Sequence, residues 1–194
     1  MRTFLLASNN PGKLREFREI FSEDRIVSLQ ELSLDIEVEE DGQTFEENAL
    51  KKAREVAEIS GMTSISDDSG LCVDALGGAP GVYSARYAGE HASDQERIQK
   101  LLQELKGETY RTARFVSVVA LCTPQGQTVI ARGECEGEIL TEPKGQGGFG
   151  YDPVFYVKEF KKTFGQLTGE EKNSISHRGR AIRALKEKLT ETAG

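Results

Sequence analysis

The spacing of apolar and polar positions predicts alternating strands and helices in the first third of the chain. Thr3–Ala7 is a short apolar run that ends in a polar turn at Ser8, which is typical of a buried strand. Apolar residues at helical spacing predict a helix over about 13–22, with Lys13 in its first turn. Thr44–Glu47 resembles a capping-box start, and an apolar stripe follows it as far as Gly61.

The rest of the chain adds strands that pair with each other rather than alternating with helices. We expect a strand over Met62–Ser66 that stops at Asp67, a loop rich in Gly and Pro as far as Gly89, and a last helix from Ser176 to about Thr192. The other expected elements are a helix over Ser93–Leu105, a hairpin of Phe115–Cys122 with Gln127–Arg132, and a strand over Tyr151–Val157. The pattern therefore predicts an α/β fold with a mixed sheet.

Length and composition favour one compact unit. The 194 residues contain no linker, and 37% hydrophobic with 29% charged residues is an ordinary globular balance, so we expect a single domain over 1–194. The net charge of -7 argues against a nucleic-acid-binding protein. Three cysteines without a C-x-x-C spacing and only two histidines argue against a disulfide framework or zinc site. No apolar run reaches the roughly 18 residues of a membrane span, and the one at the N-terminus is too short for a signal peptide, so we expect a cytoplasmic protein.

The charges are unevenly distributed along the chain. Residues 31–48 carry eight acidic residues and no Lys or Arg, whereas residues 172–188 carry six basic residues and one Glu. The first segment suits a divalent metal and the second an anion. Two solvated faces are the alternative.

The first candidate for chemistry is Ser8-Asn9-Asn10-Pro11-Gly12-Lys13, between the first strand and the first helix. A helix start presents backbone N–H donors and the positive end of the helix dipole, and the Lys13 ammonium adds charge for a phosphate. The spacing is not that of a P-loop. An ordinary turn with an N-cap is the alternative.

The second candidate is Asp67-Asp68-Ser69-Gly70, placed directly after a predicted strand. Adjacent side chains of an extended chain point to opposite sides, so only one carboxylate need face a given site. Such a carboxylate can hold Mg²⁺ or deprotonate a water, and the acidic segment around Glu39 and Glu40 is the source of a second one. An Asx-type turn is the alternative.

The third candidate lies in 145–153, which contains the spacing G-x-G-x-x-G. We reject a dinucleotide-binding role, because that motif must follow a strand and open a helix. Glycines around Phe149 instead favour a backbone that a ligand can approach, with the ring available for base stacking and Asp152 for hydrogen bonds. A core phenylalanine in a glycine-rich loop is the alternative.

The fourth candidate is the basic segment 172–180. Ser176 is the expected N-cap of the last helix, so His177 and Arg178 lie in its first turn, where positive charge opposes the helix dipole. With Lys172 they offer donors for carbonyl oxygens of a purine ring. A solvated basic helix start is the alternative.

Taken in order, these segments resemble the inosine/xanthosine triphosphate pyrophosphatase family, also called Ham1-like. The resemblance spans nearly the whole chain. The motifs that carry it are Ser8–Lys13, Thr44–Ala49, Asp67–Leu71, Gly77–Tyr87, Gly148–Pro153 and Ser176–Arg178.

The resemblance implies a homodimeric enzyme that uses Mg²⁺ to hydrolyse non-standard purine triphosphates, such as those of inosine, deoxyinosine and xanthosine, to the monophosphate and pyrophosphate. It implies a two-lobed single unit around a long mixed twisted sheet flanked by helices, with the site in the cleft between lobes. It assigns metal binding and water activation to Asp68, metal binding also to Glu40 or Glu39, and substrate contact to Ser69. It assigns the triphosphate to Ser8, Asn9, Asn10, Pro11, Gly12, Lys13 and Lys52, the enclosure of the base to Phe149, Gly150, Tyr151 and Asp152, and the 6-oxo group to Lys172, His177 and Arg178.

Overall fold

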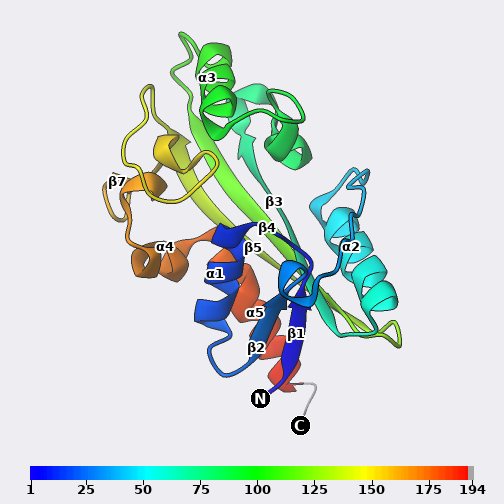
Figure 1. Ribbon diagram of the computed structural model, residues 1–194. Coiled ribbons are helices and arrows are strands. Elements are labelled where there is room, and N and C mark those ends of the chain that lie inside the picture. The colour runs from blue at the N-terminus through cyan, green and yellow to red at the C-terminus, as the bar shows by residue number, and fades with distance from the viewer. Residues whose placement is uncertain (192–194) are drawn as a thin grey trace. The chain divides into compact units, whose positions relative to one another are not determined.

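The computed structural model describes residues 1–191 and confirms a mixed α/β fold (Figure 1). Within these residues seven strands form one sheet in the order β2-β1-β3-β4-β5-β6-β7. The chain clusters into two compact units. The first unit contains Met1–Asp68, Ser117–Gly133 and the chain from His177 onward, and the second contains Ser69–Val116 and Glu134–Ser176. Strands β3, β4 and β5 each contribute residues to both units.

Five helices and the seven strands have the following bounds in the described part of the chain. The strands are β1 Thr3–Leu6, β2 Arg25–Ser28, β3 Ser64–Val73, β4 Thr112–Cys122, β5 Thr128–Ile139, β6 Phe155–Val157 and β7 Lys162–Thr163. The α-helices are α1 Pro11–Ile20, α2 Phe45–Ser60, α3 Asp94–Glu104, α4 Gly169–Ile175 and α5 His177–Glu191. Short 3-10 helices cover Gln30–Leu32, Asp74–Leu76, Gly81–Arg86, Asp152–Val154 and Phe164–Gln166. No helix in residues 1–191 is long and apolar enough to cross a membrane.

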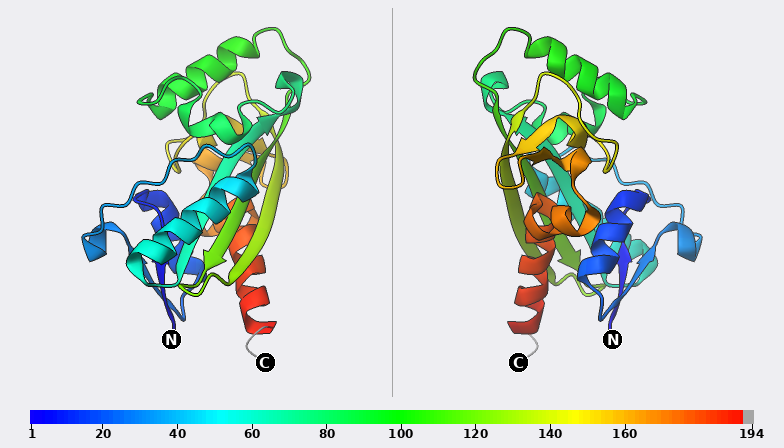
Figure 2. Two further views of the ribbon diagram at one scale, coloured as in Figure 1. Left: turned by 90° about the vertical axis from the view of Figure 1, so that its right-hand side faces the viewer. Right: turned by 90° about the vertical axis from the view of Figure 1, so that its left-hand side faces the viewer.

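In the first unit the two faces of the sheet are covered by different helices. Phe4 and Leu6 of β1 pack with α1 and α5, whereas Leu5 and Ala7 pack with α2 through Val56. This division follows from the alternation of side chains along a strand. Figures 1 and 2 show α2 on the opposite side of the strands from α5. The two faces matter for the site because the part of β3 that belongs to the first unit ends with two adjacent aspartates, Asp67 and Asp68.

The core of the second unit is built around a cluster of aromatic rings. Phe115, Phe155 and Phe164 lie with ring centroids 4.4 to 5.5 Å apart. Helix α3 packs against the same core through Ile98 and Leu101. Its N-terminus has a complete capping box between Ser93 and a glutamate of the first turn, so its start is well defined.

Several strand boundaries differ from the sequence predictions. Strand β3 does not stop before Asp67 but continues to Val73, so both aspartates lie inside a strand. Carboxylates disfavour strands, but burial against cationic and amide partners outweighs that preference. Strand β2, Arg25–Ser28, was not predicted, and β5 continues seven residues beyond the expected Arg132.

Helix boundaries agree more closely with the predictions. Helix α1 begins at Pro11, two residues early, because Asn10 caps it and proline is favoured in a first turn. Thr44 caps α2 as expected, although Glu47 accepts a hydrogen bond from Gln43 instead of closing a capping box. Helix α5 begins directly after Ser176, and its expected end at Thr192 lies outside the described residues.

One predicted strand is partly wrong. Of the expected Tyr151–Val157, only Phe155–Val157 forms a strand, and Asp152–Val154 forms a 3-10 helix. Pro153 explains the difference, because it fixes φ and provides no N–H for a ladder. Asp152 therefore lies in a tight turn next to Phe149.

Candidate active site

The Ser8–Lys13 segment forms the start of α1. The Asn10 side chain accepts hydrogen bonds from the backbone N–H groups of Gly12 and Lys13, at 2.9 and 3.1 Å, and the Ser8 hydroxyl accepts one from Asn10. Asn10 is thus an N-cap, as in an ordinary helix start. The Lys13 ammonium lies 3.0 Å from Asp67 Oδ1. Any anion binding by this segment therefore involves a lysine already held by a carboxylate.

Asp67 is the buried centre of a charge network on the α1/α5 face of β3. It is 1% exposed, and its Oδ2 accepts a hydrogen bond of 3.0 Å from Arg178 Nε. Arg178 also pairs with Glu16 of α1, 2.5 Å away. Burial by itself lowers the pKa of Arg178, but the charges of Glu16 and Asp67 outweigh burial and raise it. Asp67 and Arg178 thereby join β3, α1 and α5.

Asp68 lies on the opposite side of β3, facing α2. It is 6% exposed, and its Oδ2 accepts a hydrogen bond of 3.0 Å from the Asn48 amide. Burial, with the negative charge of Glu40, raises the pKa of Asp68 to about 6, against the opposing effects of Asn48, Lys52 and Lys13. Asp68 is therefore a carboxyl whose charge the folded protein does not fully compensate.

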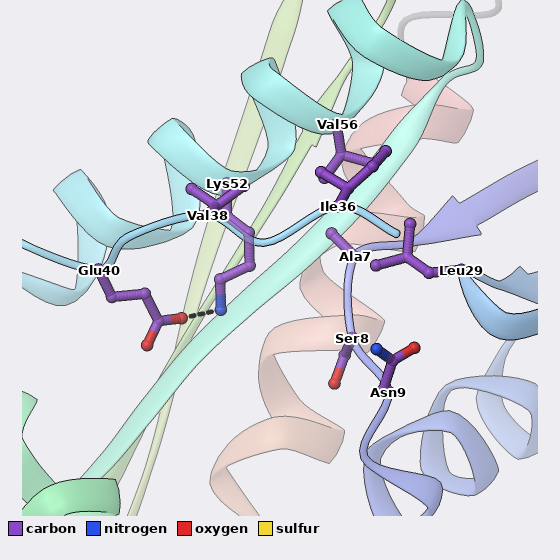
Figure 3. A pocket seen from close by; sticks show the side chains of 9 residues that line it. All are labelled: Ala7, Ser8, Asn9, Leu29, Ile36, Val38, Glu40, Lys52 and Val56. Atoms are coloured by element: carbon purple, nitrogen blue, oxygen red, sulfur yellow. Dashed lines mark ion pairs between the residues drawn. The ribbon is translucent and has the colours of Figure 1, made fainter. Parts of the chain in front are cut away.

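Exposure distinguishes the two candidate glutamates. Along the extended segment 34–40, every second side chain is turned inward: Leu34, Ile36 and Val38 pack against the apolar cluster under α2. Glu40 continues this inward series, whereas Glu39 is exposed. The Glu40 carboxylate forms an ion pair with Lys52 of α2 (Figure 3).

A pocket of about 210 Å³ lies beside this ion pair. Figure 3 shows Glu40 and Lys52 at one side of it and Ser8 and Asn9 at another. The Lys52 ammonium also donates a hydrogen bond of 3.1 Å to the Asp67 carbonyl. The pocket therefore combines lysine and carboxylate groups with the polar end of β1, all within the first unit.

Asp68 and Glu40 are the carboxylates that could hold a magnesium ion, because both influence the same buried charge near Lys52. Residues 1–191 contain no cluster of three or more His, Cys, Asp or Glu that is arranged to hold a metal. Magnesium does not need one, since it commonly takes one or two protein carboxylates and completes its shell with water and phosphate oxygens. Burial, and then the charge of Glu40, raises the pKa of Asp68, and a cation at this carboxylate would offset both effects.

The residues predicted to enclose the base lie in the second unit together with Lys172. The Lys172 ammonium lies 2.8 Å from Asp152 Oδ2 and 4.6 Å from the centroid of the Phe149 ring. The same Asp152 oxygen accepts a hydrogen bond from the Phe149 N–H. Gly148 and Gly150 both have positive φ, 70° and 62°, which explains the glycines on either side of Phe149.

The remaining predicted residues have different environments. Tyr151 is buried, its hydroxyl donates a hydrogen bond of 2.7 Å to the Ser84 carbonyl, and burial raises its pKa. His177 is also buried, as the first residue of α5, while Ser69 is partly exposed on β3. Of the three groups predicted to contact the 6-oxo group, Lys172 belongs to the second unit and His177 and Arg178 to the first.

Two side chains of the site were not predicted from the sequence, namely Glu16 and Asn48. Both are polar residues at buried helical positions: Glu16 precedes the buried Phe17, and Asn48 lies between Phe45 and Ala49 on the buried face of α2. A polar residue in an apolar stripe signals a buried partner. That signal was present in the sequence.

Comparison with known proteins places this fold and this sequence in one protein family. A family model described as the Ham1 family matches residues 4–188. A dITP/XTP pyrophosphatase of Clostridium perfringens is 50% identical, covering 97% of this chain and 98% of the relative. One of Desulforamulus reducens is 53% identical, covering 95% and 94%. The solved structure of the Staphylococcus aureus Ham1 protein has a TM-score of 0.88 at 46% identity, covering 98% of this chain and 99% of that one. The chain belongs to the Ham1 family.

Proposed function

We propose that this protein hydrolyses non-canonical purine nucleoside triphosphates, those of inosine, deoxyinosine, xanthosine and deoxyxanthosine, to the monophosphate and pyrophosphate. Relatives at about 50% identity over nearly the full length are dITP/XTP pyrophosphatases. The observation that carries the proposal is the arrangement around Asp68, a buried carboxyl of raised pKa influenced by one further carboxylate and two lysines. A protein that only binds a nucleotide has no need of such a group.

In this proposal the first unit handles the phosphates. Asp68 and Glu40 would hold Mg²⁺, which would supply positive charge against the phosphate oxygens and lower the pKa of a water. Asp68 accepts the proton of the water that attacks the α-phosphorus, and pyrophosphate leaves. In the metal-free protein burial, and then the charge of Glu40, raises the pKa of Asp68 to about 6. Lys13 and Lys52 neutralise charge on the triphosphate. Asp67 positions Lys13, so its role is structural.

The second unit recognises the base through the Phe149 loop. The Phe149 ring stacks on the purine, and the Lys172 ammonium over the same ring is available to the 6-oxo oxygen. Adenine has an amino group at this position, which cannot accept a hydrogen bond from an ammonium. A donor here therefore favours inosine and xanthosine over adenosine. His177 and Arg178 are proposed as further donors to the same oxygen.

Pyrophosphate release from inosine triphosphate tests the proposal. The purified protein with Mg²⁺ should release one pyrophosphate per monophosphate, and EDTA should stop the reaction until Mg²⁺ is added back. Asp68→Asn should lower kcat at least about a hundredfold. Asp41→Asn is the matched control, because Asp41 belongs to the same acidic segment but pairs with Lys51 on the surface. Release of orthophosphate alone, or full activity of Asp68→Asn, would contradict the proposal.

Two further properties belong to the same proposal. We propose that the protein forms a homodimer, which size-exclusion chromatography with light scattering tests by the mass in solution. We also propose that it acts in the cytoplasm, where its triphosphate substrates are formed.

A further inference from the structure

The first turn of α3 carries a carboxylate that holds the Phe149 loop. Asp94 Oδ2 accepts a hydrogen bond of 2.9 Å from the Gly150 N–H. Its other oxygen, Oδ1, accepts one of 2.6 Å from Arg97 Nη1. Arg97 in turn donates from Nε to the Ala85 carbonyl, at 2.8 Å. Asp94 and Arg97 thus connect three segments of the second unit: α3, the loop at 148–152 and the segment 81–86.

The loop at 148–152 needs the hydrogen bond to Asp94 because its glycines do not fix the backbone conformation by themselves. Phe149 lies between two glycines with positive φ, and a Cβ on Gly150 would have no neighbour within 4 Å. Packing therefore does not fix the backbone at Gly150. Two carboxylates fix it instead: Asp152 accepts the Phe149 N–H and Asp94 accepts the next one. Because glycine has no strong conformational preference of its own, these two hydrogen bonds determine the direction of the Phe149 ring.

The carboxylate itself is held rigidly. Ser93 caps α3 and Ile98 and Leu101 anchor the helix in the core, so Asp94 is attached to a stable element. Tyr151 adds a second tie, because its hydroxyl donates to the carbonyl of Ser84, the residue before Ala85. The loop is thus attached to one framework at two successive residues, Gly150 and Tyr151.

We infer that Asp94 and Arg97 are positioning residues that set the orientation of the Phe149 ring and thereby the affinity for the purine base. This inference rests on the proposed role of Phe149 in the proposed function. In the proposed function neither Asp94 nor Arg97 touches the base, and the phosphate-binding residues Lys13, Lys52 and Asp68 lie in the first unit. The expected effect is therefore on base affinity and not on the chemical step.

The test compares Asp94→Ala, Asp94→Asn and Arg97→Ala with the wild type. Glu136→Gln is the matched control, because it removes one carboxylate from an exposed pair of the same unit. Asp94→Ala should raise KM for inosine triphosphate about fivefold with kcat within about twofold, the effect of one charge-assisted hydrogen bond at a half-exposed site. Asp94→Asn retains an acceptor for the Gly150 N–H and should recover most of the loss. Arg97→Ala should raise KM about twofold, and the control should have no effect.

Two binding measurements separate this inference from the proposed function. Calorimetric affinity for inosine monophosphate should fall in Asp94→Ala in step with the rise in KM, while inhibition by inorganic tripolyphosphate, which lacks a base, should not change. An unchanged monophosphate affinity in Asp94→Ala would overturn the inference. It would also be overturned if inhibition by tripolyphosphate weakened by the same factor as monophosphate binding, or if the melting temperature fell so far that partial unfolding explained the weaker binding. An inactive wild type would contradict the proposed function alone, since the monophosphate measurement still decides the role of Asp94.

Discussion

Replacing Asp68 by Asn should stabilise the metal-free protein at neutral pH, although it removes the proposed catalytic base. The folded structure raises the pKa of Asp68 from 3.8 to about 6, mainly through burial and then through the charge of Glu40. The ionised form is therefore less favourable in the folded chain than in the unfolded chain. That pKa difference corresponds to about 3 kcal/mol, since one pKa unit is about 1.4 kcal/mol.

The effect has a defined pH window. Between pH 3.8 and about 6 the folded chain still holds a proton that the unfolded chain has lost, so stability falls as the pH rises across this range. The penalty is complete above the window and absent below it. Asparagine carries no charge at any pH and keeps an acceptor for the Asn48 amide. The variant should therefore gain up to about 3 kcal/mol at pH 7.5 and almost nothing near pH 4.

Urea denaturation followed by circular dichroism, with EDTA present, measures this difference at both pH values. Asp41→Asn is again the control. Its exposed ion pair with Lys51 lowers the pKa of Asp41, so that variant should not gain stability at pH 7.5. An Asp68→Asn variant that is no more stable than the wild type at pH 7.5, or that gains the same stability at both pH values, would show that ionised Asp68 does not destabilise the fold.

Three further predictions concern the first unit. Arg178→Met leaves two buried carboxylates without their shared cation and should cost about 3–5 kcal/mol in urea denaturation at pH 7.5; an undiminished midpoint would contradict this. Gly133→Ala places a Cβ 2.2 Å from the His177 carbonyl oxygen and should lower the melting temperature by several degrees, whereas Gly169→Ala, with open space, should not. Lys52→Gln removes a charge that lowers the folded-state pKa of Asp68, so the upper limit of the pH window should rise in the same titration while its lower limit stays at the pKa of the unfolded chain.

The elements that the sequence predicted best are those with local signals. The cap at Thr44 and the helical periodicity over Ser93–Leu105 located α2 and α3 to within a residue. The predicted strand ended before Asp67, whereas β3 continues, because Asp67 and Asp68 have low strand propensity. Their partners come from α1, α2 and α5, far away in the chain. Strand β2 has only two apolar residues, Ile26 and Val27, which is too short an apolar run to distinguish it from a turn.

The site was predictable wherever local periodicity decided it. The alternation of Leu34, Ile36 and Val38 in the sequence places Glu40 on the inner side and Glu39 on the outer side. The family resemblance by itself left the choice between the two glutamates open. The sequence also requires Asp67 and Asp68 to face opposite ways. It does not say which of the two meets cations, because that depends on which helices cover each face of the sheet.

The packing of the helices is thus what gives two adjacent aspartates different chemistry. On one face, α1 and α5 bring a lysine and an arginine to Asp67, so its charge is satisfied and it serves as a structural joint. On the other face, α2 brings an amide to Asp68, and its lysine is paired with Glu40. The charge of Asp68 is consequently under-compensated in the metal-free chain, which is the condition under which a carboxylate would bind a metal or accept a proton near neutral pH.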